Sequence, residues 1–241
     1  MSKTIFITGS TDGIGLATAQ ELLGAGHQVM IHGRNAEKLQ DVEKQLRTIA
    51  GETQVETYLA DLSEMKDVDD LARAVTDNHS RLDVLINNAG VHGGRRDATG
   101  NGLDPRFAVN TISPYLLTQR LLPLLGSSGR VINVSSAALV TVDVRALTGP
   151  NTLSHADAYA QSKLALTMWS RHMAQAHGVN GPVIIAVSPG SLLGSKMVKQ
   201  TYGIDGGDIR IGAEILTRAA LDEEFAAHSG DYYDNDEGSF A

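Results

Sequence analysis

The chain has 241 residues, 42% of them hydrophobic and 20% charged, which is typical of a folded protein with one α/β domain or two small ones. Its formal net charge of −8 argues against nucleic acid as a partner. It contains no cysteine, which excludes disulfides, thiolate catalysis and cysteine-ligated metal, and its 8 histidines show no metal-binding spacing.

Short apolar runs alternate with longer helical patterns, and this alternation predicts a parallel sheet wound by helices. The expected strands are Thr4–Thr8, Gln28–His32, Gln54–Leu59, Val84–Asn87, Arg130–Ser135 and Val183–Ser188, with a short seventh near Asp231–Asp234. The expected helices are Ile14–Ala25, Glu37–Ala50, Met65–His79, Pro105–Leu125, Asp157–His177 and Gly212–Leu221. No linker or composition shift divides the chain. We therefore predict one doubly wound α/β domain over residues 1–241, with a mostly parallel seven-stranded sheet and helices on both faces.

The first predicted strand stops at Gly9, which makes it too short for a signal peptide or a membrane span. No later segment approaches the roughly 18 apolar residues that a span needs. The sequence predicts a cytoplasmic protein with no membrane partner.

Three connections are longer than is typical of α/β units, and all three follow predicted strands. They span residues 92–103, 137–156 and 190–211. Doubly wound folds bind ligands at the carboxyl edge of the sheet, so we expect these connections to wall a substrate pocket. The apolar, glycine-punctuated segment 190–211 fits a substrate lid, and it equally fits ordinary helix packing.

A glycine-rich turn, Thr8–Gly15, lies between the first strand and the first helix. Gly9, Gly13 and Gly15 permit a tight turn, so backbone N–H groups and the helix N-terminus can approach a pyrophosphate. A turn that only reverses the chain is the alternative, but the position directly after the first strand favours cofactor binding. The other residues expected at this cofactor site are Ser10, Thr11 and Ile14.

Tyr159 and Lys163 lie four residues apart in a predicted helix, which places a phenol and an ammonium on one helix face. A nearby ammonium favours the phenolate, so we expect Lys163 to lower the pKa of Tyr159 from its ordinary value of about 10. A tyrosine of this kind can pass a proton to or from a substrate oxygen near neutral pH.

Several motifs occur in order along the chain: Thr-Gly-x-x-x-Gly-x-Gly at Thr8–Gly15, Asn-Asn-Ala-Gly at Asn87–Gly90, then Asn110, Ser136, Tyr159 with Lys163, and Pro189-Gly190. With these motifs the sequence resembles the short-chain dehydrogenase/reductase family over nearly its whole length. The 22 residues between Ser136 and Tyr159 exceed the spacer of compact members and are similar to that of retinol-dehydrogenase-like members. This insert leaves the shape of the substrate pocket open.

The resemblance implies that Asn110, Ser136, Tyr159 and Lys163 act together in catalysis. Tyr159 would be the general acid in reduction and the base in oxidation, and Ser136 would bind the substrate oxygen. Lys163 would bind the nicotinamide ribose, and Asn110 would hold a water that links Lys163 to solvent. Two alternatives stay open: Ser135 in place of Ser136, and an Asn110 that only kinks or hydrates its helix.

The resemblance also implies cofactor contacts beyond the glycine turn, Tyr159 and Lys163. Asp61 and Leu62 would meet the adenine, the alternative for Asp61 being a helix N-cap, for which Ser63 competes. The remaining expected contacts are Asn88, Ala89 and Gly90 on the floor of the cofactor site, and Pro189, Gly190 and Leu192 beside the nicotinamide amide.

The second predicted strand runs into Gly33-Arg34, with no carboxylate where NAD-binding proteins hold the ribose 2′-hydroxyl. The Arg34 guanidinium can instead bind a 2′-phosphate through charge-assisted hydrogen bonds. We therefore predict NADP(H) over NAD(H), the alternative being that Arg34 is only a solvated residue near a helix start.

The motifs together predict an NADP(H)-dependent oxidoreductase that interconverts a carbonyl and an alcohol on a small to medium, fairly apolar molecule by direct hydride transfer. An NADP(H)-binding sensor or scaffold with little or no turnover is the alternative, and epimerisation or dehydration on the same fold is a third hypothesis. The resemblance suggests a homodimer or homotetramer, with the helices Pro105–Leu125 and Asp157–His177 as natural contact faces.

Overall fold

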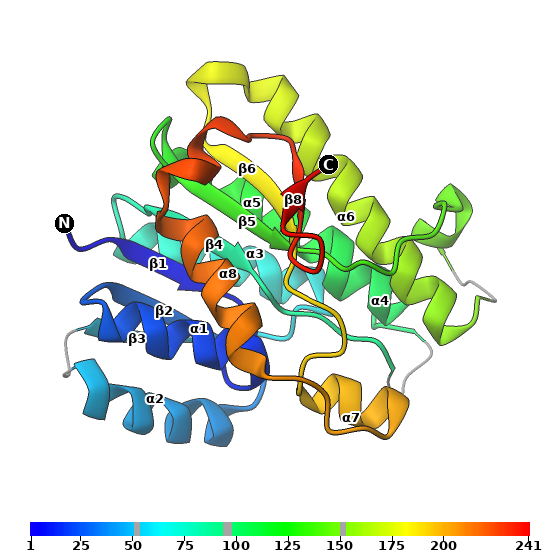
Figure 1. The fold of residues 1–241 in the computed structure, drawn as a ribbon, viewed down its shortest axis with the longest axis horizontal. Helices are drawn as coiled ribbons and strands as arrows, with labels where there is room; N and C mark the ends of the chain where they lie inside the picture. Colours follow the sequence, from blue (N-terminus) through cyan, green and yellow to red (C-terminus); the bar gives the residue numbers. More distant parts are fainter. Residues whose placement is uncertain (51–53, 94–97, 150–152) are drawn as a thin grey trace.

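Figure 1 shows the computed structural model of the chain, which describes residues 1–50, 54–93, 98–149 and 153–241. Parts of the predicted pocket walls, residues 94–97 and 150–152, lie outside the described residues.

One eight-stranded sheet forms the centre of the molecule, with strand order β3-β2-β1-β4-β5-β6-β7-β8. Its parallel strands are β1 (Thr4–Ile7), β2 (Gln28–Gly33), β3 (Val55–Leu59), β4 (Val84–Asn87), β5 (Arg130–Val134), β6 (Val183–Ser188) and β7 (Tyr232–Asp234). The last strand, β8 (Ser239–Phe240), pairs antiparallel with β7. The seven predicted parallel strands are confirmed. The eighth was not expected, because two residues in a polar segment produce no apolar pattern.

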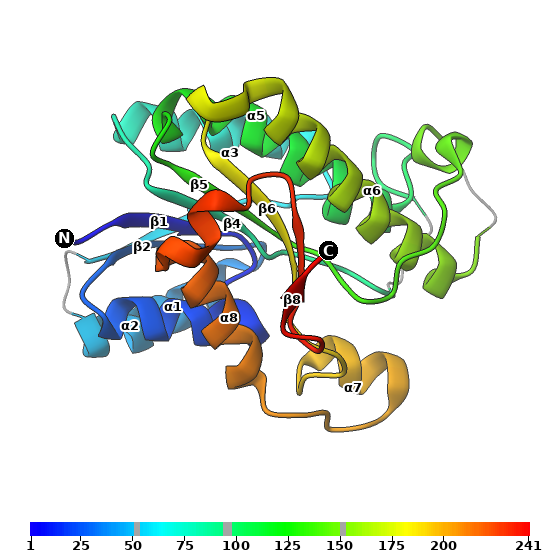
Figure 2. The same cartoon turned by 45° about the horizontal axis from the view of Figure 1, so that its top comes forward.

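Helices cover both faces of the sheet (Figure 2). On one side lie α1 (Gly13–Gly24), α2 (Ala36–Ala50) and α8 (Ile209–Leu221), and on the other α3 (Met65–Asn78), α5 (Ser113–Leu125) and α6 (His155–His177). The short helices are α4 (Pro105–Phe107), α7 (Lys196–Tyr202) and three 3₁₀ turns at Val144–Leu147, Gly178–Asn180 and Glu223–Ala227. Within the described ranges, none of the helices combines the length and apolar character needed to cross a bilayer.

The single helix predicted over Pro105–Leu125 is wrong in one respect, because a π-helical turn, Ala108–Ile112, separates α4 from α5. In this turn the N–H of Ser113 bonds the carbonyl of Ala108, five residues earlier. Pro114 has no N–H to donate to the carbonyl of Asn110, so the regular i→i−4 ladder is interrupted here. Asn110 lies inside the interruption.

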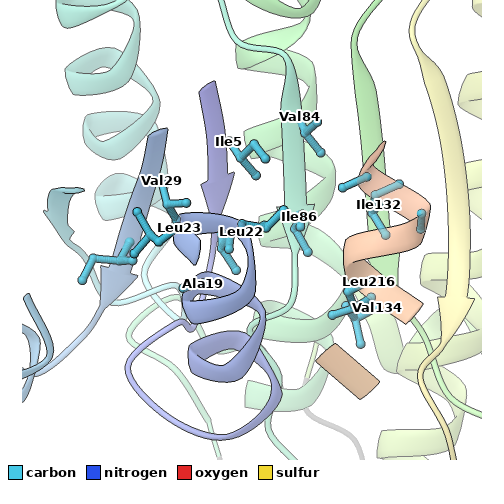
Figure 3. Packing of buried hydrophobic residues seen from close by; sticks show 14 of the residues in the cluster. Ile5, Ala19, Leu22, Leu23, Val29, Val84, Ile86, Ile132, Val134 and Leu216 are labelled. Carbon is cyan, nitrogen blue, oxygen red and sulfur yellow. The ribbon is translucent and has the colours of Figure 1, made fainter. Parts of the chain in front are cut away.

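The strands are buried on both faces, and alternate residues of β1 enter different halves of the core. Ile5 and Ile7 pack in the cluster under α1 and α8, which also contains Leu22 and Leu216 (Figure 3). Phe6 packs on the other side with residues of α3 and α5. This period of two is the geometry of a strand covered on both faces, and it fixes where β1 ends and the glycine turn begins.

Truncation of Leu22 tests this core. Leu22 is fully buried between α1 and the sheet, so Leu22→Ala is expected to lower the free energy of unfolding by about 2–5 kcal/mol. Ile49 on α2 is 46% exposed, and Ile49→Ala, the matched control, is expected to cost much less. Urea denaturation of both variants is the measurement, and equal losses would contradict this description of the core.

Candidate active site

The glycine turn packs directly against the end of β4. Gly9 has a φ of 65°, and a Cβ there would lie 2.8 Å from Cα of Ala89. A Cβ on Gly15 would lie 2.4 Å from Nδ2 of Asn88. Glycine is therefore required at both positions by close packing as well as by backbone conformation.

Asn88 holds the turn through its side-chain amide. Its Nδ2 donates to the carbonyls of Thr8 at 2.9 Å and Gly9 at 3.0 Å. The Thr8 hydroxyl in turn accepts hydrogen bonds from the backbone N–H groups of Asn88 and Ala89, both at 3.1 Å. Two of the residues expected on the cofactor floor thus have a demonstrable structural role, as supports of the glycine turn.

His32, on β2, holds the same turn from the other side and was missed by the sequence analysis. Its Nδ1 accepts the N–H of Gly9 at 3.1 Å, and its Nε2 lies 3.1 Å from the carbonyl of Ala60. The backbone of His32 is also tied to Ser10, whose N–H donates to the His32 carbonyl and whose hydroxyl accepts the His32 N–H. Burial lowers the pKa of His32 to about 4, so the ring is neutral near pH 7.

The N-terminus of α1 follows the turn. The Asp12 side chain accepts the N–H of Gly13 at 2.8 Å, and the following N–H groups of the first helical turn have no acceptor within the helix. Asp12 also forms an ion pair with Lys38 of α2. Although burial raises the pKa of Asp12, the hydrogen bond and charge of Lys38 outweigh it and lower the pKa below its ordinary value.

The expected 2′-phosphate residue, Arg34, is exposed just beyond β2, and within the described ranges it has no hydrogen bond or ion pair. A Cβ on Gly33 would lie 2.6 Å from the Thr11 methyl group, so Thr11 packs over the end of β2. Arg34, Lys38 and Thr11 thus border one side of the turn. Lys38 was not named from the sequence, because a lysine in a helical pattern gives no signal of what it faces.

The expected catalytic residues come from three neighbouring elements at the carboxyl edge of the sheet. Ser136 lies two residues beyond the end of β5, and Tyr159 and Lys163 lie on α6, which packs against this strand. The Nζ of Lys163 is 5.8 Å from the centroid of the Tyr159 ring. The Ser136 side chain lies close enough to Tyr159 to oppose the rise that burial causes in the pKa of its phenol, and the Ser136 hydroxyl accepts the N–H of Ala138 at 3.1 Å.

The side chains of Ser135 and Ser136 have different surroundings. The Ser135 hydroxyl is buried beneath α6, 2.7 Å from the Thr167 hydroxyl and 3.3 Å from the Lys163 carbonyl. Ser136 points to Tyr159 instead, because successive residues at a strand end face opposite ways.

Lys163 is 3% exposed and donates a 2.6 Å hydrogen bond from Nζ to the carbonyl of Val134. Burial lowers its pKa to about 8. A Cβ on Gly90 would stand 3.5 Å from this Nζ, so the absence of a side chain there keeps the ammonium uncovered on that side.

The expected direction of the Tyr159 pKa shift is wrong for the chain by itself. Burial raises the pKa of the phenol, the hydrogen bond with Ser136 opposes this rise, and Tyr202 adds to it. The Lys163 ammonium donates to the Val134 carbonyl, and it does not offset the rise that burial causes in the pKa of the Tyr159 phenol.

Asn110 clamps the loop after β4. Its Oδ1 accepts the N–H of Val91 at 2.8 Å, and its Nδ2 donates to the Val91 carbonyl and the Ser162 hydroxyl, both at 2.9 Å. Both amide protons are therefore used, and a water at this residue would have to donate to the second lone pair of Oδ1 or bind the backbone. The alternative that Asn110 marks an irregular helix agrees with the π-helical turn.

The expected adenine residues lie beyond β3. The Asp61 carboxylate accepts the N–H and hydroxyl of Ser63, at 3.0 and 2.8 Å. Leu62 is buried, and its carbonyl accepts the Ser113 hydroxyl at 2.5 Å. The N-cap residue of α3 is Glu64, so the alternative of an N-cap at Asp61 or Ser63 is wrong.

The C-terminal hairpin supports the segment that follows β6, and the sequence analysis missed this contact. Asn235 donates from Nδ2 to the Pro189 carbonyl at 3.0 Å, and Asp236 accepts both the N–H and the hydroxyl of Ser191. The Tyr232 hydroxyl donates to the Ser136 carbonyl at 3.2 Å. The hairpin thus holds Gly190 and Leu192, whose φ values are 122° and 51°.

The segment expected as a lid contains α7, and its two ends are joined. The N–H of Gly194 donates to the Gly207 carbonyl at 2.7 Å, and the N–H of Gly207 donates to the Leu192 carbonyl at 2.8 Å. From α7, Tyr202 contacts the His92 ring at 6.1 Å between centroids, and His92 contacts the Tyr159 ring at 4.8 Å. A lid role stays a prediction.

The doubly wound parallel sheet, with a glycine turn opening α1, defines a Rossmann-type α/β protein. Residues 3–203 match the short chain dehydrogenase family, and the chain belongs to it. It is therefore an oxidoreductase of carbonyl and alcohol groups.

Among curated relatives, human retinol dehydrogenase 13 is 31% identical, over 96% of this chain and 76% of that protein. Human polyprenol dehydrogenase is 33% identical, over 78% of this chain and 60% of that protein. A solved structure described as the Pseudomonas aeruginosa RhlG/NADP active-site complex has a TM-score of 0.78 and 27% identity, covering 96% of this chain and 94% of that one.

Substitution of the last turn glycine tests the close packing. Gly15→Ala forces a Cβ onto Asn88 and the Gly9 carbonyl, so it is expected to cost about 1–3 kcal/mol of stability and to weaken dinucleotide binding. Gly24→Ala in the same helix meets nothing within 4 Å and is expected to be neutral or to stabilise by up to about 1 kcal/mol. Thermal unfolding and NADPH fluorescence titrations measure both effects. Similar behaviour of the two variants would contradict the packing argument.

The neutral, buried His32 predicts a pH dependence of stability. Between its ordinary pKa of 6.5 and its folded pKa of about 4, the unfolded chain binds a proton that the folded chain does not. Stability from this group is thus complete above pH 6.5 and falls as the pH drops to 4, by up to about 3 kcal/mol. Urea denaturation at pH 7 and pH 4.5 is expected to show a smaller loss for His32→Gln than for the wild type. Equal losses of stability in both proteins would refute His32 as the source of the pH dependence.

Proposed function

We propose that this oxidoreductase uses NADP(H) to interconvert a carbonyl and an alcohol on a small to medium, fairly apolar substrate. One observation carries the proposal: the Tyr159 phenol, the Ser136 hydroxyl and the buried Lys163 ammonium meet at the carboxyl edge of the sheet, beside Gly90. Together these groups can give a proton to a substrate oxygen and stabilise the charge that develops on it.

The residues present fit a nicotinamide dinucleotide. Free N–H groups at the start of α1 would bind the diphosphate, and Asn88 and Ala89 would form the floor beneath it. Lys163 would bind the nicotinamide ribose past Gly90, and the Pro189–Leu192 segment would hold the amide. When bound, the cofactor supplies or accepts the hydride.

In reduction, the Tyr159 phenol gives its proton to the substrate oxygen while Ser136 donates a hydrogen bond to the same oxygen. The raised pKa of Tyr159 keeps the phenol protonated near pH 7, which is the form that this direction requires. Oxidation needs the phenolate, and therefore a nearby positive charge such as that of the oxidised nicotinamide. In the chain by itself, Tyr159 is therefore in the protonated form that reduction uses.

The preference for NADP(H) rests on Arg34 and Lys38, which offer two cations on the side of the turn where a 2′-phosphate would lie. Lys38 would bind the phosphate at the expense of its ion pair with Asp12. The RhlG structure that resembles this chain is described as an NADP complex, which supports the same preference.

An apolar substrate is supported by the residues around the opening. Exposed apolar side chains in the segments that border Tyr159 include Val140, Leu192 and Ile204, and the exposed Tyr202 stands opposite His92. Two relatives are named for retinol and polyprenol, which are apolar alcohols.

Replacement of the phenol separates an enzyme from a sensor that only binds the cofactor. Tyr159→Phe is expected to lower kcat by about 10²–10⁴-fold, because the proton donor is lost, and to leave NADPH binding nearly unchanged. Tyr115→Phe removes a phenol that bonds only Gln119 among the described residues and serves as the control. NADPH consumption with a panel of ketones, aldehydes and quinones is the assay. Full turnover in Tyr159→Phe would exclude the proposed acid.

Removal of the guanidinium tests the cofactor preference. Arg34→Ala is expected to weaken NADPH binding by about 10–100-fold and to leave NADH binding unchanged, because only the 2′-phosphate loses a charge-assisted partner. Arg171→Ala, which removes an exposed arginine of α6, is the charge-matched control. Calorimetric titration with both nucleotides is the measurement, and an equal loss for NADPH and NADH would argue against a 2′-phosphate contact.

A further inference from the structure

Both ring nitrogens of His32 are committed, and their partners fix the tautomer. Gly9 donates its N–H to Nδ1, so this nitrogen carries a lone pair. The partner of Nε2 is the Ala60 carbonyl, which can only accept, so the proton of the ring is on Nε2. A neutral ring in one tautomer therefore joins β2 to the glycine turn and to the end of β3.

The bond to Gly9 decides what the first glycine of the turn offers to a ligand. Its N–H is directed to His32, and its carbonyl is held by Asn88 at 3.0 Å. Side chains thus already bond both backbone polar groups of Gly9, and its N–H is not available to a ligand. The diphosphate is left to the N–H groups that follow, at the start of α1.

The path of those later residues depends on the bond to His32. Gly9 sits in the left-handed region, with a φ of 65°, and closes against Ala89. The peptide between Thr8 and Gly9 is bonded at both of its polar groups. Asn88 donates to the Thr8 carbonyl from the β4 side, and His32 accepts the Gly9 N–H from the β2 side, so this peptide plane has one orientation. This orientation sets the direction in which the following residues of the turn enter α1.

We infer that His32 is a positioning residue for the diphosphate of the cofactor: its neutral Nδ1 orients the glycine turn through Gly9 and presents the N-terminus of α1 to the ligand. The inference rests on the proposed NADP(H) dependence. It assigns a role to a residue that touches neither the cofactor nor the substrate. This role requires an acceptor at Nδ1, so protonation of the imidazole would remove the bond to Gly9.

Two substitutions separate the effects of the two hydrogen bonds that the His32 ring forms. In His32→Asn the amide oxygen takes the place of Nδ1 and retains an acceptor for Gly9. In His32→Gln the amide nitrogen takes the place of Nε2 and retains a donor for Ala60 but no acceptor for Gly9. Calorimetric titration with NADPH is expected to show His32→Asn within about threefold of the wild type and His32→Gln weaker by at least about tenfold.

A smaller ligand separates positioning from a general loss of structure. Adenosine 2′-monophosphate carries the 2′-phosphate without the diphosphate, so its affinity is expected to be the same in both variants and the wild type. At saturating NADPH, kcat is expected to be unchanged in His32→Gln, with the effect confined to KM. Equal NADPH affinities in the two variants, or parallel losses for NADPH and adenosine 2′-monophosphate, would overturn the inference.

The tautomer is measured on the wild-type protein, so the inference stays testable even where a variant does not fold. Nitrogen-15 spectra of histidine-labelled protein at pH 7 are expected to show His32 as the Nε2–H form. An Nδ1–H tautomer or a charged ring would overturn the inference. A wild type that binds neither NADPH nor NADH would refute the proposed function and this inference with it. Tight NADPH binding by His32→Gln would refute the inference alone.

Discussion

The side chains of Asn88 and His32 hold the glycine turn in one conformation, and the rest of the site depends on this constraint. Gly9 and Gly15 can approach Ala89 and Asn88 only because neither has a Cβ, and this closeness brings the start of α1 to the end of β4. Asn88 and His32 then satisfy the polar groups that such a tight turn cannot pair within itself. An unpaired buried amide would cost about 1–3 kcal/mol, so the turn and its two supports form one structural unit.

Burial acts on Tyr159 and Lys163, the two groups expected to act in catalysis, in the same sense, toward their uncharged forms. It raises the pKa of Tyr159 and lowers that of Lys163 to about 8. Neither group therefore tunes the other strongly in the chain by itself, and Lys163 is held by the Val134 carbonyl. The charge that a phenolate needs must come from outside the chain, which makes proton transfer at Tyr159 dependent on the ligands that share the site.

Much of the fold follows from the sequence, because strands buried on both faces appear as apolar runs whatever their neighbours are. The break in the helix at Asn110 was hidden, since it arises from Pro114 together with a tertiary clamp on Val91. In the candidate site, the order of motifs predicted Tyr159, Lys163 and Ser136, which lie near one another in the structure, whereas His32 resembled any other residue of a buried strand. Its role depends on Gly9 and Ala60, which lie 23 and 28 residues away, and no local pattern encodes that pairing.

The residues that hold the catalytic groups and those that border the substrate belong to different parts of the chain. The glycine turn, Asn88 and Lys163 are fixed by buried contacts with the sheet, and the C-terminal hairpin secures Ser136 and Pro189 from outside it. The residues around the opening, such as Tyr202 and His92, touch through rings and have few buried polar bonds. The wall is therefore held by fewer polar bonds than the glycine turn and Lys163, although His92 packs on the Tyr159 ring. This separation agrees with the names of two relatives of this chain, at 31% and 33% identity, which refer to different alcohols.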